Sequence, residues 1–356
     1  MTDDATSGGE DRLHPRQRSV LLGHGKAERR LLDAYNAGKL HHAWILNGPR
    51  GIGKATLAYR FARFLLANPL KHGERRETLT IDEHDPLFRR VAAQGHSDLL
   101  TVTRSFDQRS KRLKGEIGVD DVRPVSQFLA RTAGEGGYRV VVVDAADEMN
   151  ANAANALLKS LEEPPPQTVF LLIAHVIGRL LPTIRSRCTR LELQPLPEET
   201  VARVLDTLPA ELVPQVSTDQ RNLTIRLAEG SPGRALQMLG SGSLRMFEDF
   251  SRLMASVPGI DYQRVLDFAD SLRAINVIDD YRLFTDLLEQ WLSRRIRDAA
   301  RGIDDWNGIL RPDRIGAWMD VHRAIVHSIA QANALNLDRR EVIVQAFRLI
   351  DDSARA

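Results

Sequence analysis

The stretch Gly48-Pro-Arg-Gly-Ile-Gly-Lys54 decides the fold class of this chain. It follows a short apolar run, Ala43-Trp-Ile-Leu46, and precedes residues 55–67, whose apolar side chains recur at helical spacing. A strand, a GxxxxGK loop and a helix in this order form a phosphate-binding loop. The backbone amides of residues 50–54 and the ammonium group of Lys54 can cradle a phosphate there.

The loop lacks the hydroxyl that usually holds magnesium, because Ala55 stands where the pattern has serine or threonine. Thr56 comes one residue later, and helical geometry turns its side chain by about 100°. Two interpretations therefore stay open, an ATP-binding loop and a loop kept only for its turn. The candidate nucleotide-binding residues are Gly48, Gly51, Gly53, Lys54, Thr56 and Asp144.

Asp144 comes from a second apolar strand, Val140-Val-Val-Val143, which is expected to deliver its carboxylate to the same site. Ala145 follows it and offers no group that could accept a proton. Asp147 and Glu148 are the alternative bases, but they lie on the turn into the next helix, where acidic residues are favoured by the helix dipole.

Composition indicates a folded globular protein. The 356 residues suffice for two or three domains, and 43% of them are hydrophobic. A formal net charge of +2 does not by itself indicate nucleic acid or a membrane as a partner. A single cysteine is consistent with a reducing cytosol. Apolar runs are too short to span a bilayer. We expect a cytoplasmic protein with no membrane partner.

Strands alternate with helices up to about residue 193, and helical patterns occupy almost all of the remainder. This order predicts an α/β three-layer P-loop domain with a mainly parallel sheet, followed by helical parts. The expected divisions are a disordered tail over 1–14, the P-loop domain over 15–195, a small helical lid over 196–240 and a helical domain over 241–356.

Three motifs together resemble the bacterial replicative clamp-loader subunits of the AAA+ superfamily. They are the phosphate loop, Leu157-Leu-Lys-Ser-Leu-Glu-Glu-Pro-Pro165 and Thr183-Ile-Arg-Ser-Arg-Cys188. Within that family, Gly95-His-Ser-Asp98 and Gly118-Val-Asp-Asp-Val-Arg123 are most similar to the delta-prime branch of DNA polymerase III. The resemblance implies an AAA+-like domain, a lid and a C-terminal collar that packs into a five-subunit ring.

The same resemblance implies a subunit that does not hydrolyse ATP. Active members carry a glutamate where this chain has Ala145, and a polar sensor residue where it has Ala174 and His175. Arg234 matches a sensor arginine only approximately. Arg187 in Ser-Arg-Cys matches the arginine that such subunits send into a neighbour's ATP site, so it is the candidate catalytic residue, acting in trans.

Family members commonly carry four zinc-binding cysteines, whereas residues 55–143 contain none. Zinc is therefore not expected, no cofactor is required, and the phosphate loop permits ATP binding. His72, His84 and His96 are interpreted as ordinary residues. The implied partners are the tau/gamma motor subunits and the delta subunit, with the sliding clamp and primed DNA reached through the complex. The chain would be one component of the DNA polymerase III holoenzyme.

Several alternatives stay open at this stage. The chain is either the helper just described, an active tau/gamma-like ATPase, or a nucleotide-independent scaffold in which Arg187 only caps its helix or pairs with an acid. Cys188 is interpreted as a packing residue. A basic stretch is either a DNA contact or a solvated hairpin loop, and its residues are Arg104, Arg109, Lys111, Arg112 and Lys114.

Overall fold

The computed structural model describes residues 14–67, 75–107, 112–240, 243–272, 277–303, 305–335 and 337–356. The chain divides into two compact units, 1–237 and 238–356. The finer division into a P-loop domain, a lid and a collar stays a prediction.

The described residues of the first unit form seven strands. Five form one sheet in the order β2-β5-β6-β1-β7, and the other two pair as a hairpin. The strands are β1 (Ala43–Asn47), β2 (Leu99–Val102), β3 (Phe106–Asp107), β4 (Arg112–Leu113), β5 (Arg139–Asp144), β6 (Thr168–Ala174) and β7 (Thr189–Glu192). All neighbours in the main sheet run parallel. The expected mainly parallel sheet is confirmed.

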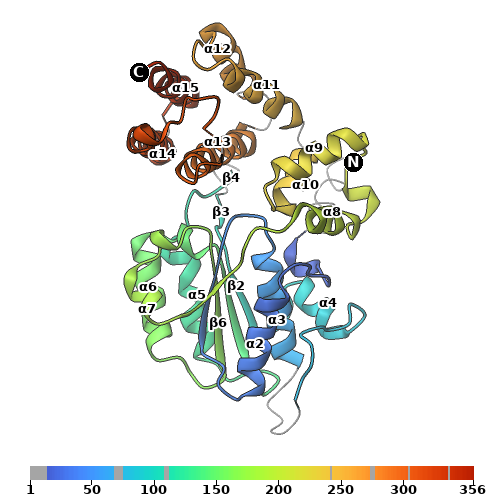
Figure 1. Ribbon diagram of the computed structural model, residues 1–356. Coiled ribbons are helices and arrows are strands. Elements are labelled where there is room, and N and C mark those ends of the chain that lie inside the picture. The colour runs from blue at the N-terminus through green and yellow to red at the C-terminus, as the bar shows by residue number, and fades with distance from the viewer. Residues whose placement is uncertain are drawn as a thin grey trace, which may run out of the picture. The chain divides into compact units, whose positions relative to one another are not determined.

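Helices cover both faces of this sheet (Figure 1). On one face lie α2 (Gly25–Asn36), α3 (Lys54–Ala67) and α4 (Pro86–Ala92), and on the other lie α5 (Val119–Leu129), α6 (Ala151–Glu162) and α7 (Pro182–Ser186). Because both faces are buried, β5 and β6 are continuous apolar runs rather than alternating ones. Each such side chain contributes about 1.5–3 kcal/mol on burial.

Local sequence signals account for the ends of helix α6. The side chain of Asn150 accepts a hydrogen bond from the amide of Ala153 at 2.9 Å, as expected of an N-cap. Three prolines after Glu163 end the helix, since they supply no amide hydrogen and disfavour a helical residue before them.

Sequence reasoning missed one short helix of the first unit, whereas a hairpin was one of its two interpretations of the basic stretch. Helix α4 begins at Pro86, and the Asp85 side chain accepts from the Leu87 amide at 2.8 Å, a cap that the Asp-Pro pair could have signalled. The basic stretch forms the β3–β4 hairpin, in which Phe106 pairs with Leu113. Arg109 and Lys111 lie outside the described residues.

In the described residues after the sheet, the regular elements are all helices. They are α8 (Glu198–Asp206), α9 (Thr218–Leu227) and α10 (Pro232–Gly240), and in the second unit α11 (Ser243–Ala255), α12 (Tyr262–Ser271), α13 (Val277–Ala300), α14 (Ile315–Leu335) and α15 (Arg339–Arg355). The second unit has an aromatic core built on Phe250, Phe284 and Phe347. Trp306 and Trp318 are buried and in mutual contact, so they are packing residues.

Candidate functional site

The phosphate loop lies between β1 and α3 at the carboxyl edge of the sheet. Gly51 adopts a φ of 71° and Gly53 a φ of 106°, both in the region that glycine tolerates best. His24, the residue just before α2, also holds the loop in place, because its Nε2 lies 2.6 Å from the Ile52 carbonyl oxygen. Sequence analysis did not identify this residue. The loop is therefore held in shape by the surrounding protein.

Lys54 is buried, with 3% of its surface exposed. Its ammonium donates hydrogen bonds to the carbonyl oxygens of Gly48 at 2.6 Å and Pro49 at 2.5 Å. Burial lowers the pKa of Lys54 to about 8, while the charges of Asp144 and Asp147 oppose that shift. A buried cation thus lies at the base of the loop.

Five of the six candidate nucleotide-binding residues line one cavity of about 280 Å³ in the first unit, and the sixth, Gly48, is not among its lining residues. Gly51, Gly53, Lys54, Thr56 and Asp144 all line it, as does Ala55. Burial raises the pKa of Asp144 to about 6, and the Lys54 charge limits the rise. Apolar side chains line the same cavity, and they are those of Val20, Leu21, Leu22, Leu196, Val204, Leu208 and Leu236.

Neither alternative base is a free carboxylate. Asp147 is buried, and its two oxygens accept from the amides of His175 at 3.0 Å and Val176 at 2.8 Å. Glu148 pairs with Arg50 and, at 2.9 Å, with Arg104. Both acids therefore tie neighbouring loops together.

The sensor position at the end of β6 also lacks a group suited to hydrolysis. Ala174 is fully buried, and His175 lines the cavity. Burial lowers the pKa of His175 to about 2, assisted by the cations Lys54 and Arg50. His175 is neutral at ordinary pH, and its Nδ1 is buried without a hydrogen-bond partner.

The start of α10 packs directly on the phosphate loop. The amide of Gly233 donates to the Gly51 carbonyl at 2.9 Å, and the Ser231 hydroxyl donates to the Arg50 carbonyl at 2.8 Å. A Cβ on Gly233 would lie 2.8 Å from Gly51 Cα, so only glycine permits this approach. Arg234 is buried and lies 3.9 Å from Glu229.

Arg187 lies away from that cavity, at the C-terminal end of α7. Its guanidinium donates to the Thr183 carbonyl at 2.9 Å and pairs with Glu162 at 2.6 Å. These are the two contacts that the capping alternative predicts. The Arg187 side chain is 36% exposed and that of Glu162 47% exposed, so the pair lies at the surface.

Cys188, the next residue, packs against the core on the α5–α6 side of the sheet. Burial raises the pKa of its thiol to about 12, which disfavours the thiolate. The interpretation as a packing residue agrees with this environment.

The remaining motif residues have structural contacts. Asp98 accepts from the amides of Gly134 at 2.7 Å and Glu135 at 3.0 Å, and buried His96 accepts from the Asp98 amide at 3.1 Å. His84 is exposed, and His72 lies outside the described residues. Within the described part of the chain, no cluster of three or more His, Cys, Asp or Glu is placed to hold a metal ion.

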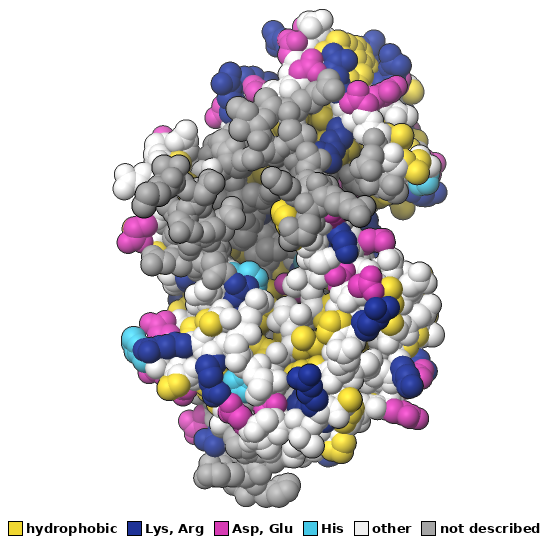
Figure 2. All heavy atoms as spheres, turned by 180° about the vertical axis from the view of Figure 1, so that it is seen from behind, with side chains coloured by type: hydrophobic (Ala, Val, Ile, Leu, Met, Phe, Trp, Pro, Cys, Tyr) yellow, Lys and Arg dark blue, Asp and Glu magenta, His cyan; other side chains and the backbone are white. Residues whose placement is uncertain are grey.

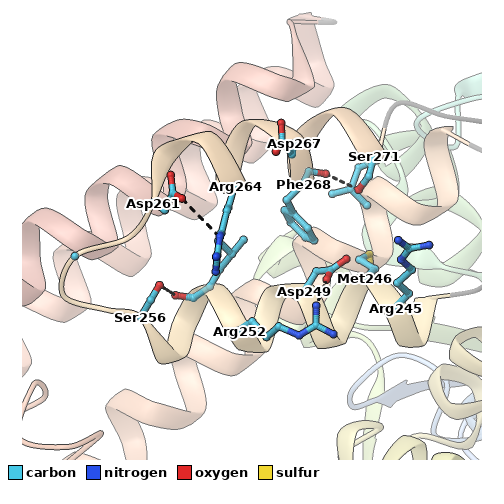
Figure 3. Close-up of a pocket in the computed structure, with 13 residues that line it drawn as sticks. Arg245, Met246, Asp249, Arg252, Ser256, Asp261, Arg264, Asp267, Phe268 and Ser271 are labelled. Carbon is cyan, nitrogen blue, oxygen red and sulfur yellow. Dashed lines mark hydrogen bonds and ion pairs between the residues drawn. The ribbon is translucent and has the colours of Figure 1, made fainter.

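The second unit has a larger groove, of about 830 Å³, between α11 and α12 (Figure 3). Four of the charged side chains that line it form ion pairs on its own walls, Arg252 with Asp249 at 2.8 Å and Arg264 with Asp261 at 3.6 Å.

Surface charge shows no bias on the face drawn in Figure 2, where basic and acidic side chains are interspersed over the described residues. Among the helices of the described ranges, none has both the length and the apolar character needed to cross a membrane.

A phosphate loop after β1 of a parallel sheet, with helices on both faces and helical parts following, defines a P-loop protein of the AAA+ type. The profile of the family described as "DNA polymerase III, delta subunit" matches residues 23–197. The chain belongs to the family of the delta-prime subunit of DNA polymerase III.

Similar proteins include the DNA polymerase III subunit delta' of Pseudomonas aeruginosa, 39% identical over 56% of this chain and 56% of that protein. The delta' subunit of Escherichia coli K12 is 34% identical over 67% of this chain and 66% of its own length. The gamma/tau subunit of Mycobacterium tuberculosis is 27% identical over 83% of this chain and 52% of that protein. The chain therefore spans about half to two thirds of these relatives.

Proposed function

We propose that this chain is a non-hydrolysing, delta-prime-like subunit of the DNA polymerase III clamp loader. The observation that carries this proposal is the separation of two sets of groups. The chain has Ala55 and Ala145 at the positions that the metal ligand and the base would take in its own site, while Arg187 lies at the surface elsewhere. A chain of this kind is suited to serve a neighbour's site rather than its own.

Arg187 would act as an arginine finger in trans. A guanidinium at the γ-phosphate stabilises the charge that develops during phosphoryl transfer, and such an arginine is worth roughly 10³–10⁵ in rate. To reach a neighbour's phosphate, Arg187 must exchange Glu162 for the phosphate. An exposed ion pair contributes only about 0.2–1 kcal/mol, so the exchange costs little.

The partners follow from the family. Relatives of this chain are named as delta' and as gamma/tau subunits of DNA polymerase III. The proposed complex contains tau/gamma motor subunits and a delta subunit, and it loads the sliding clamp on primed DNA. This chain is then one component of the polymerase holoenzyme, with polymerisation on another subunit.

The alternative of an active tau/gamma-like ATPase meets three obstacles in the described site. Ala55 lacks a hydroxyl, Ala145 lacks a carboxylate, and Asp147 is engaged by two backbone amides. Steady-state ATPase activity of the isolated chain that Lys54→Ala abolishes would favour this alternative. The contacts of Arg187 with Thr183 and Glu162 within the chain favour the scaffold alternative. The following experiment distinguishes the scaffold from the arginine finger.

The test reconstitutes the complex with its motor subunits, clamp and primed DNA, and compares wild type with Arg187→Ala in single-turnover ATP hydrolysis. We expect a slow phase, at least about tenfold slower, from the site next to this subunit. Arg190→Ala is the matched control, because Arg190 is an exposed arginine on neighbouring β7. Unchanged kinetics in an intact Arg187→Ala complex would leave a scaffold and refute the arginine-finger role.

A further inference from the structure

The β3–β4 hairpin presents a pair of large apolar side chains to solvent. Phe106 is 52% exposed and Leu113 is 56% exposed, and the two residues are cross-strand partners. Because directly opposite residues of an antiparallel pair lie on the same face, the aromatic ring and the leucine side chain together form one small apolar surface. No other two of the exposed large apolar residues in the described ranges are strand partners.

The base of the hairpin is held in place by charged and polar side chains from other loops. The Nε of Arg104 lies 2.9 Å from a carboxylate oxygen of Glu148, and Glu148 also pairs with Arg50 of the phosphate loop. After β4, the Glu116 carboxylate accepts a hydrogen bond from the Asn150 side-chain amide at 2.7 Å. Two strands alone are only marginally stable, so these contacts help to hold the hairpin in its place after the carboxyl end of β2 (Figure 1).

The sequence around this apolar pair is strongly basic. Residues 104–114 contain five basic residues and one acid, Asp107, whereas the whole chain carries a formal net charge of only +2. Arg104 is bound by Glu148. Lys114, the residue after Leu113, is exposed and has no ion-pair partner among the described residues. A local excess of positive charge of this kind favours an anionic partner.

The partner that fits this surface combines a negative charge with a flat face that can stack on an aromatic ring. Unpaired nucleotides have both, because each offers a phosphate and a base, and stacking of bases on aromatic side chains is a general mode of single-strand binding. In a duplex the base faces are covered by the neighbouring base pairs. A single strand therefore suits the exposed ring of Phe106 better than a duplex does.

We propose that the β3–β4 hairpin is a binding site for single-stranded DNA, with a base stacked on Phe106 beside Leu113 and a phosphate paired with Lys114. The proposal rests on the proposed function for the source of its ligand, since primed DNA carries an unpaired template strand. It gives this chain a direct contact with DNA, in addition to the action of Arg187 on a neighbouring subunit.

The test measures binding of a fluorescein-labelled oligo(dT) of about 20 nucleotides to the full chain by fluorescence anisotropy at several salt concentrations. We expect Phe106→Ala to weaken binding at least about fivefold. Lys114→Ala should reduce the slope of log K against log salt concentration by about 0.7, the value for one phosphate contact on a single strand. The matched controls are Met319→Ala and Lys39→Ala, because Met319 is 51% exposed on α14 and Lys39 is an exposed lysine beyond the end of α2.

A second variant, Phe106→Trp, makes the stacking itself the readout. Tryptophan keeps a flat ring at this exposed position, so the variant should bind oligo(dT) as tightly as wild type, and the added fluorescence should be quenched by the bound strand. Equal binding by wild type and Phe106→Ala, or no binding of oligo(dT) by wild type, would overturn the proposal.

Anionic vesicles that contain phosphatidylserine test the other partner that a basic and apolar surface could have. If Phe106→Ala lost binding to these vesicles and kept its binding to oligo(dT), the hairpin would be a membrane contact and the proposal would be wrong. None of these results bears on Arg187, because the Arg187→Ala experiment measures hydrolysis on a neighbouring subunit. Failure of the arginine-finger role would likewise leave the DNA contact of the hairpin intact.

Discussion

Asp147→Asn separates a structural from a catalytic role for Asp147, one of the two alternative bases. In the folded chain its two oxygens accept from two consecutive amides, those of His175 and Val176. Asparagine keeps the shape of the side chain but replaces one oxygen with an NH₂ group. That group meets an amide hydrogen, so one hydrogen bond is lost and one buried donor is left unsatisfied.

The expected cost follows from those two contacts. A hydrogen bond to a charged acceptor contributes about 1.5–3 kcal/mol, and the residue is only 8% exposed, so water replaces it poorly. We expect Asp147→Asn to lower the free energy of unfolding by about 2–3 kcal/mol, and Asp147→Ala, which loses both bonds, by about twice that. In a unit of this size the asparagine variant should melt about 5–10 °C earlier.

The assay is urea unfolding followed by circular dichroism, with thermal melting as a second measure. Asp120→Asn is the matched control, because Asp120 is 73% exposed and its pair with Arg123 lies at the surface; its effect should stay within about 0.5 kcal/mol. If Asp147→Asn is as stable as this control, the two hydrogen bonds from the amides of His175 and Val176 contribute little to stability. Asp147 would then be free for chemistry, and an active ATPase site would again be compatible with the structure.

Three further outcomes are expected. Burial holds the pKa of His175 near 2 in the folded chain, against 6.5 in the unfolded chain. The unfolded state therefore binds a proton that the folded state does not, so the free energy of unfolding falls as pH falls below 6.5, by up to about 1.4 kcal/mol per pH unit. In urea unfolding, His175→Gln should show a weaker dependence of this free energy on pH between about pH 7 and pH 5. Gly233→Ala places a methyl group against Gly51 and should cost about 1–3 kcal/mol on denaturation, whereas Gly240→Ala, whose Cβ meets nothing within 4 Å, should not destabilise. The raised thiol pKa of Cys188 should make it react with an aromatic disulfide reagent at least about tenfold more slowly in the folded than in the unfolded chain. Equal rates in both states would contradict its packed environment.

Much of the fold could be predicted from the sequence. The loop Gly48–Lys54, the apolar run before Asp144 and the cap at Asn150 each depend on neighbouring residues, and the structure has the expected strand or helix at each place. Periodicity and capping are local properties, which is why they are legible in a sequence. The missing hydroxyl at Ala55 and carboxylate at Ala145 are equally legible, because they are matters of residue type.

Which groups are free and which are occupied was decided only by the tertiary structure. Glu148 meets Arg50 and Arg104, Gly233 closes on Gly51, and His24 anchors Ile52, all across long sequence separations. No local pattern encodes such contacts, because they arise when the packed sheet brings separate loops to one edge. The sequence by itself determined what this site lacks, and the packing determined how its remaining charges and amides are arranged around one cavity.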